Sequence, residues 1–163
     1  MNLELGSGDR PYGGDDWVHN DERDLPHIEL VGAAEHISQL VEPDSVDCLR
    51  AAHLLEHFSW RDTSAVLEDW YKVIRPGGQI WIEVPSLEWQ AQELLEKSGA
   101  YGAFRDEHMV EFIYGSQNYP GNYHKAAFTV DLLRQKLEDA GFVDVEVYQA
   151  GQILDAHGTK AVR

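Results

Sequence analysis

The first residues of the chain carry its clearest chemical signal. Leu3-Glu4-Leu5 is predicted to be a short strand, and Gly6-Ser7-Gly8 follows it directly. Two glycines this close let the backbone turn sharply and bring main-chain N–H groups against a ligand, because no Cβ stands in the way. Asp21 follows a second predicted strand, Trp17–Asn20, and its carboxylate can accept hydrogen bonds from both hydroxyls of a ribose. The pattern predicts a nucleoside site.

The loop favours a nucleoside without a pyrophosphate. A dinucleotide site needs a third glycine and a helix whose N-terminus faces the phosphates. Pro11 stands at the third-glycine position, and the Gly, Pro and Asp content of residues 9–16 predicts almost no helix there. The acidic side chains of Asp9, Asp15 and Asp16 would repel a pyrophosphate and attract a cationic cofactor.

Histidines are the candidates for proton transfer and for metal binding. His53, Glu56 and His57 spell the inverted zinc-peptidase motif, in which two histidines bind zinc and the glutamate is the base. The motif follows a strand end directly and no third ligand stands at a helical spacing, so we predict no metal, and a zinc hydrolase is kept only as a lesser alternative. His57 is expected to be structural. His53 and His124 are the candidate catalytic bases, since imidazole titrates near neutral pH.

Composition narrows the class of protein. The 163 residues carry 29 acids against 13 bases, a net charge of −16. This field repels phosphate backbones and anionic lipid, so we expect neither nucleic acid nor a membrane as partner. The single cysteine, Cys48, excludes an intramolecular disulfide, and the sequence shows no signal peptide or long apolar run. We therefore expect one globular domain, residues 1–163, in the cytoplasm.

Alternation of strands and helices predicts an α/β sheet. Trp70 and Trp81 are expected in the core, and residues Tyr101–Phe128 are expected to form an irregular, lid-like insert rich in aromatic residues and glycine. The predicted strands are Leu3–Leu5, Trp17–Asn20, Ile28–Val31, Val46–Leu49, Gln79–Val84, Val143–Val147 and Thr159–Arg163. The predicted helices are a weak one over Ala33–Leu40, one from Asp62 or Thr63 that is stopped by Pro76-Gly77-Gly78, one from Leu87 to Gly99, and Leu132–Ala140.

Several of these segments resemble, in order, the class I S-adenosylmethionine-dependent methyltransferases, and within them the small methyltransferases of the type 11 kind. The resemblance is carried by Leu3–Gly8, Trp17–Asp21, Asp44–Asp47, His53–His57 and Arg75–Gly78, with Tyr114–Tyr119 and Asn122–Lys125 similar to a subset of that group. It implies a Rossmann-like sheet, mostly parallel with an antiparallel edge strand, in a three-layer sandwich. It also gives His53–His57 a place that needs no zinc.

The resemblance further implies a cofactor and its site. The cofactor is S-adenosylmethionine, leaving S-adenosylhomocysteine as product, and the reaction is methyl transfer to oxygen or nitrogen of a small molecule. A non-catalytic protein that binds either compound is the main alternative. Glu4 is expected to organise the loop, Gly6, Ser7 and Gly8 to contact the methionine part, and Asp21 to bind the ribose. Backbone groups of Ala33 and Ala34 would contact adenine, where an aspartate is common, and Ala52 and His53 would flank the sulfonium. No helix precedes the first strand to cover the site, so the insert or a second copy, in a homodimer, is expected to do so.

Overall fold

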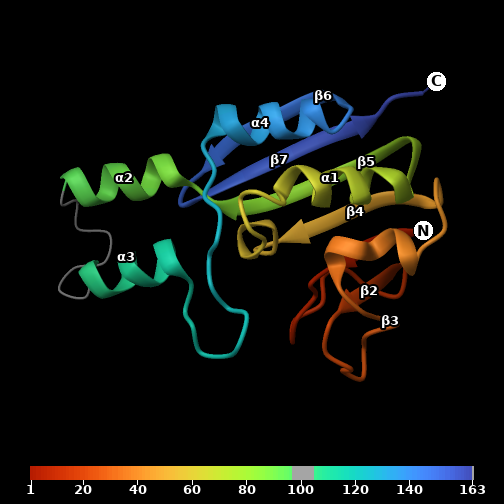
Figure 1. Ribbon diagram of the computed structural model, residues 1–163, viewed down its shortest axis with the longest axis horizontal. Helices are drawn as coiled ribbons and strands as arrows, with labels where there is room; N and C mark the ends of the chain where they lie inside the picture. Colours follow the sequence, from red (N-terminus) through yellow and green to blue (C-terminus); the bar gives the residue numbers. More distant parts are fainter. Residues whose placement is uncertain (97–104, 163) are drawn as a thin grey trace.

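A seven-stranded sheet forms the centre of the computed structural model, which describes residues 1–96 and 105–162 (Figure 1). Its strand order is β3-β2-β1-β4-β5-β7-β6. The strands are β1 Asn2–Leu5, β2 Trp17–Asp21, β3 Leu30–Val31, β4 Val46–Ala52, β5 Ile74–Pro85, β6 Phe142–Ala150 and β7 Ile153–Lys160. Every pair from β3 to β5 is parallel, whereas β7 runs antiparallel to both β5 and β6. The predicted sheet, mostly parallel with an antiparallel strand at one edge, is confirmed.

Helices pack on one face of this sheet. The α-helices α1 (Thr63–Val73) and α4 (Val130–Asp139) lie side by side there with the 3₁₀ helix η1 (Ala34–Gln39) (Figure 1). The apolar stripe of α1 includes Trp70, which is fully buried and whose indole N–H donates to Ala34 O at 2.8 Å. Strand residues that alternate along β1, β4, β5 and β7 fill the core beneath these helices: Leu3, Leu5, Leu49, Ala51, Ile80, Ile82, Leu154 and Ala156.

The opposite face of the sheet carries a cluster of aromatic and charged side chains. The loop between β1 and β2 lies on it, with the Tyr12 ring edge-on to Trp81 at 5.3 Å between centroids. The Arg50 guanidinium stacks over both rings, and His157 stacks on Trp81 at 5.7 Å. The prediction that Trp81 lies in the core is therefore wrong. Its side chain is only partly buried, because Trp81 is in register with Arg50 and His157 and shares this face of the sheet with them.

The segment Arg75–Gly78 lies inside a strand. Helix α1 ends at Val73 and β5 begins at Ile74, whereas the sequence predicts a helix stop at Pro76-Gly77-Gly78 and a strand from Gln79. The register between β4 and β5 shifts across this point, from Val46–Ile74 to Cys48–Gln79. The glycines allow this bulge because a Cβ on Gly78 would lie 2.9 Å from the carbonyl oxygen of Val46.

The last two strands are longer than predicted. β7 begins at Ile153 and not at Thr159, because its inward positions after Leu154 are Ala156 and Gly158, residues too small to give an apolar pattern. In β6 the predicted alternation of valines breaks at a bulge, where Asp144 has a φ of 51°. As a result Val143 is exposed while Phe142 and Val147 are buried.

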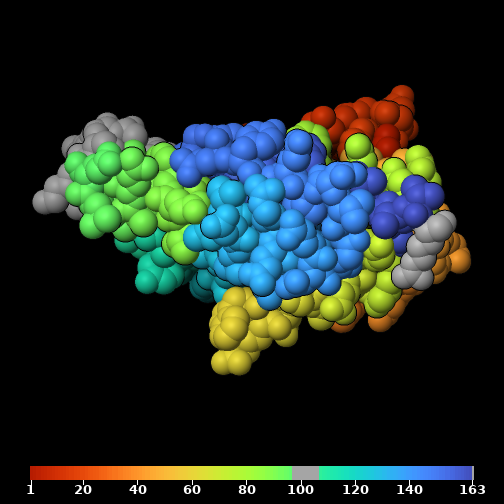
Figure 2. Space-filling model, turned by 90° about the horizontal axis from the view of Figure 1, so that it is seen from above, coloured from red at the N-terminus to blue at the C-terminus, as the bar shows by residue number. Residues whose placement is uncertain are grey.

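The predicted insert, Tyr101–Phe128, is only partly irregular. It contains a helix, α3 (Arg105–Tyr114), whose Met109 is buried and whose Phe112 carbonyl accepts from Gln90 of α2 (Leu87–Glu96) at 3.1 Å. Residues 115–128 are without regular helix or strand, and residues 97–104 lie outside the described part. Figure 2 shows α2 at one end of the molecule, beyond α4 and β6.

The remaining helix, α4, begins at Val130, two residues before the predicted start at Leu132, and ends at Asp139, one residue before the predicted end. Thr129 caps it by accepting from Leu132 N at 3.1 Å, and it stops before Gly141, which has a φ of 102°. No described helix is both long and apolar enough to cross a membrane.

Candidate functional site

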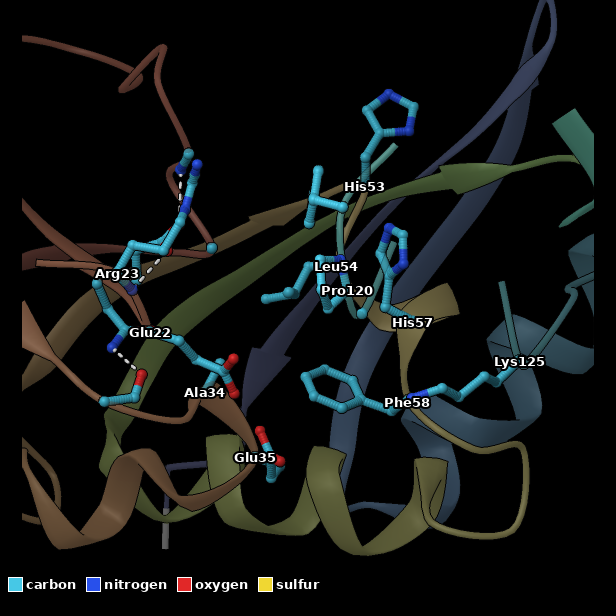
Figure 3. Close-up of a pocket in the computed structure, with 17 residues that line it drawn as sticks. Glu22, Arg23, Ala34, Glu35, His53, Leu54, His57, Phe58, Pro120 and Lys125 are labelled. Atoms are coloured by element: carbon cyan, nitrogen blue, oxygen red, sulfur yellow. Dashed lines mark hydrogen bonds and ion pairs between the residues drawn. The ribbon is translucent and has the colours of Figure 1, made fainter. Parts of the chain in front are cut away.

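A cavity of about 300 Å³ opens at the carboxyl ends of β1, β2 and β4 (Figure 3). Of the residues expected to hold a cofactor, five line this cavity: Gly6, Gly8, Asp21, Ala34 and His53. Leu54, Phe58 and Pro120 supply its apolar wall, and Lys125 and His57 lie on the same side (Figure 3). The carboxyl ends of parallel strands are where open α/β sheets bind ligands, so topology and cavity agree.

The glycine loop has the backbone that its sequence predicts. Gly6 and Gly8 have φ angles of 62° and 61°, in the left-handed region that side chains rarely adopt. A Cβ on Gly6 would lie 2.8 Å from Leu54 Cδ1. Ser7 N donates to Asn20 O at 3.0 Å, which ties the loop to β2. The loop therefore presents bare backbone to the cavity.

Asp21 is the anionic centre of the cavity. Its Oδ2 accepts from Gly8 N at 2.9 Å, and its Oδ1 accepts from Arg23 N at 2.9 Å and from Arg23 Nε at 3.0 Å. Burial opposes ionisation of this carboxyl, but the hydrogen bonds from Arg23 and Gly8 outweigh it and hold its pKa below the usual value. Asp21 is thus a carboxylate at neutral pH, with its donors already aligned.

Glu4 and Ser7 support the loop from beneath and do not line the cavity. Glu4 is buried, forms an ion pair with Arg50 at 2.6 Å, and accepts from Tyr12 N at 2.7 Å. The carboxylate oxygen that accepts from Tyr12 N, Oε2, also lies 3.1 Å from His19 Nδ1. The Ser7 hydroxyl donates to the Glu4 backbone oxygen at 3.4 Å. These contacts join the two ends of the loop between β1 and β2, which is the organising role expected of Glu4.

Two acidic residues that the sequence analysis did not single out also line the cavity. Glu22 follows Asp21 at the end of β2, and Glu35 stands in η1 beside Ala34. Figure 3 shows both side chains on the wall opposite Leu54 and Phe58. The signal for Glu22 was its place directly after the expected ribose acid. Ala33 and Ala52, by contrast, are not among the lining residues.

A second cavity, of about 600 Å³, adjoins the first, and His53, His57 and Tyr119 line both. His124 lines the second cavity only, so the two predicted catalytic histidines meet there. The Glu56 carboxylate, 3.6 Å from His53 Nδ1, raises the pKa of His53. Burial lowers the pKa of His124. At neutral pH a larger fraction of His124 than of His53 is therefore neutral and able to accept a proton, so His124 is the better candidate base.

The structure does not place the zinc-peptidase motif His53–His57 on an α-helix. His53 has a φ of 51°, and only Leu55–His57 form a single 3₁₀ turn, η2. His53 and His57 therefore do not lie one above the other on an α-helical face. A different set comes together instead: ligand atoms of Glu56, His57 and His124 all lie within 4.8 Å of one another.

Comparison with known proteins agrees with this geometry. The model of a family described as a methyltransferase domain matches residues 16–82. No curated protein matches the sequence.

Solved methyltransferases share the fold. A methyltransferase of Thermotoga maritima, described as a possible histamine N-methyltransferase, is 14% identical with a TM-score of 0.65, over 98% of this chain and 81% of that chain. A putative methyltransferase of Haloferax volcanii, solved with the Trm112 activator, is 15% identical with a TM-score of 0.61, over 99% and 82%. Human N-acetylserotonin methyltransferase, solved with S-adenosylmethionine, is 16% identical with a TM-score of 0.63, over 98% and 47%. The family match over residues 16–82 and the fold shared with these proteins bear out the resemblance to the class I S-adenosylmethionine-dependent methyltransferases.

Proposed function

We propose that the protein binds S-adenosylmethionine in the cavity of about 300 Å³ and transfers its methyl group to oxygen or nitrogen of a small molecule held in the adjoining cavity. The observation that carries this is the bond from Gly8 N to Asp21 Oδ2, which sets a bare backbone turn beside an ionised carboxylate. That pairing suits a ribose. The carboxylates of Asp21, Glu22 and Glu35 outnumber the cations Arg23 and Lys125 in the cavity lining, and this balance disfavours a pyrophosphate.

The residues fit the parts of this cofactor. The cradle at Gly6 and Gly8 is one that a Cβ would fill, and Asp21 accepts hydrogen bonds from hydroxyl groups. Ala34 and Glu35 are placed to bind the adenine end, and Leu54 and Phe58 give its ring an apolar wall. When bound, the cofactor supplies an electrophilic methyl group on a sulfonium, and the acidic lining favours that positive charge.

Methyl transfer has two requirements that the residues of this chain must meet. The cavity walls must hold the acceptor in line with the methyl group, which is the larger part of the catalysis. A side chain must also take the acceptor's proton as the new bond to carbon forms and the carbon–sulfur bond breaks, its electrons returning to sulfur. His124 is our candidate base and His53 the second, since both line the acceptor cavity.

Protein partners and location remain part of the proposal. The Haloferax methyltransferase was solved with a protein activator. A homodimer is the partner we propose for this chain, tested by light scattering, and we propose a cytoplasmic location. The alternative function is a protein that binds the cofactor without turnover.

Calorimetry with S-adenosylhomocysteine tests the binding step, because the product is stable and needs no acceptor. We expect one site per chain for the wild type and no measurable binding for Gly8→Val, which places a side chain in the cradle. Asp24→Ala is the matched control, since this exposed acid lies close by in the sequence and does not line the cavity. Failure of the wild type to bind would exclude both the enzyme and the non-catalytic alternative. Binding without turnover on a broad panel of acceptors would favour the latter.

A further inference from the structure

We infer that Glu56, His57 and His124 form a binding site for a divalent transition metal ion of the Zn²⁺ class, at the wall between the two cavities. This goes beyond methyl transfer and does not depend on it; with an ion bound, His124 is a ligand and His53, which lines the same cavity, is left as the candidate base. The ligand atoms of the three side chains lie within 4.8 Å of one another and all three residues line the cavity of about 600 Å³.

The fold assembles these ligands before any ion arrives. Glu56 and His57 stand in η2, directly after β4, while His124 comes from the segment that follows α3. The backbone holds the two segments together, because Lys125 N and Ala126 N both donate to Glu56 O, at 2.8 and 3.1 Å. The rings of His57 and His124 are 5.0 Å apart between centroids. The cluster is therefore built from main-chain contacts and does not depend on flexible side chains alone.

Both imidazoles have the tautomer that a metal needs. His57 Nδ1 lies 3.1 Å from Tyr123 O, and His124 Nδ1 lies 2.9 Å from Phe112 O. A carbonyl oxygen only accepts, so each Nδ1 carries the proton and donates it. Each neutral ring then keeps its lone pair on Nε2. This arrangement, in which the other ring nitrogen is bonded to a carbonyl, is the usual support of a metal-bound histidine.

The Glu56 carboxylate is a second, independent indication that this cluster binds a cation. Glu56 is 1% exposed, and among the described residues neither of its carboxylate oxygens accepts a hydrogen bond. The nearest basic group is His53 Nδ1, 3.6 Å away, on a side chain that is 55% exposed. A buried carboxylate without hydrogen bonds is costly unless a positive charge compensates it. An ion held by the cluster would do so.

The chemical types of the three ligands indicate which class of metal ion binds. Two imidazole nitrogens with one carboxylate form a set typical of zinc sites that keep a position open for water or a substrate. Mg²⁺ and Ca²⁺ prefer oxygen ligands throughout, so they are poor candidates. Ligand atoms around tetrahedral zinc lie about 3.3 Å apart, as bonds of about 2.0–2.1 Å require. The ligand atoms of this cluster, within 4.8 Å of one another, would therefore move closer together on binding an ion.

Metal titration of the whole chain, stripped with a chelator and then dialysed, tests the site. We expect one Zn²⁺ per chain by elemental analysis, and visible absorption bands on adding Co²⁺ that differ from those of the aqueous ion. His57→Gln and His124→Gln keep the bulk and polarity of each position, and each should weaken Zn²⁺ binding at least tenfold in a chelator competition. His36→Gln is the matched control, because this exposed histidine lies outside both cavities.

Two measurements keep the result interpretable. Circular dichroism and the melting temperature of each metal-free variant show whether it is folded, and Glu56→Gln gives a second route to the same loss of affinity. Stoichiometry far below one, or Zn²⁺ affinity equal in wild type, His57→Gln, His124→Gln and Glu56→Gln, would overturn the inference. Because these readouts need no methyl donor, they separate failure of the metal site from failure of the proposed methyltransferase.

Discussion

Arg23 donates three hydrogen bonds to the carboxylate of Asp21, from its backbone N–H at 2.9 Å and Nε at 3.0 Å to Oδ1, and from Nη2 at 3.4 Å to Oδ2. The guanidinium lines the same cavity as the carboxylate, and its side chain is 45% exposed. Gly8 N also donates to Asp21 Oδ2. The residue predicted to bind a ribose therefore already has a partner, which any ribose must share or displace. The predictions that follow start from this pair.

Removal of the Asp21 carboxylate should weaken cofactor binding. We expect Asp21→Ala to reduce the affinity for S-adenosylhomocysteine by about 1–3 kcal/mol, the usual effect of losing hydrogen bonds to a charged acceptor. Calorimetry at neutral pH measures it, with Asp24→Ala as the control. An unchanged affinity would show that the ribose is bound elsewhere.

Removal of the Arg23 guanidinium should favour the cationic form of the cofactor. Arg23→Gln removes a positive charge from the cavity wall, so S-adenosylmethionine should gain affinity relative to S-adenosylhomocysteine, which lacks the sulfonium charge. We expect a change of a few-fold in the ratio of the two dissociation constants, shrinking as salt screens the charges. Titrations of both ligands at two ionic strengths decide it. A ratio that does not move would mean that Arg23 points away from the sulfonium.

The glycine cradle can be tested by a matched pair of substitutions. Gly6 and Gly121 both have positive φ angles, 62° and 96°, so alanine at either position costs backbone strain of about 1–2 kcal/mol. A Cβ on Gly6 also meets Leu54 Cδ1 at 2.8 Å, whereas a Cβ on Gly121 meets nothing within 4 Å. Urea unfolding should show a larger loss for Gly6→Ala than for Gly121→Ala. Equal losses would remove the contact with Leu54 from the argument.

Stability should depend on the ionisation of Asp21. The pKa of this carboxyl is lowered in the folded chain, so the ionised group stabilises the fold at pH values above its unfolded pKa of about 3.9. That contribution is lost as the pH falls through the folded pKa. The unfolding free energy of the wild type should therefore exceed that of Asp21→Asn at about pH 5, and this difference should disappear as the pH falls below the unfolded pKa of about 3.9. A difference that is constant with pH would contradict this.

Hydrogen exchange should divide the predicted lid into two parts. The amides of Lys125 and Ala126 donate to Glu56 O, so they should be protected in the free protein. The exposed residues 116–121 should exchange fastest and gain protection when cofactor and acceptor are bound, as a lid would. Protection of residues 116–121 equal to that of the central strands, and unchanged by ligands, would make the segment structural.

The sequence by itself determined the features that depend on neighbours along the chain. A strand, a turn with two glycines and an acid after the next strand lie within the first 21 residues, and their spacing was enough to predict the loop and to single out Asp21, which lies beside it. The α4 helix and its stop at Gly141 were equally local, because caps and apolar stripes are set within a few residues.

The tertiary structure alone decided the contacts between segments far apart in the chain. Trp81 has the large apolar side chain of a core residue, but sheet register turns it away from the main core, to the face that carries Arg50. His124 stands far from His57 in the sequence, and only main-chain bonds to Glu56 O bring the two rings together. No local pattern encodes such a meeting, since it arises from how the strands order and how the connecting segments fold back over their ends.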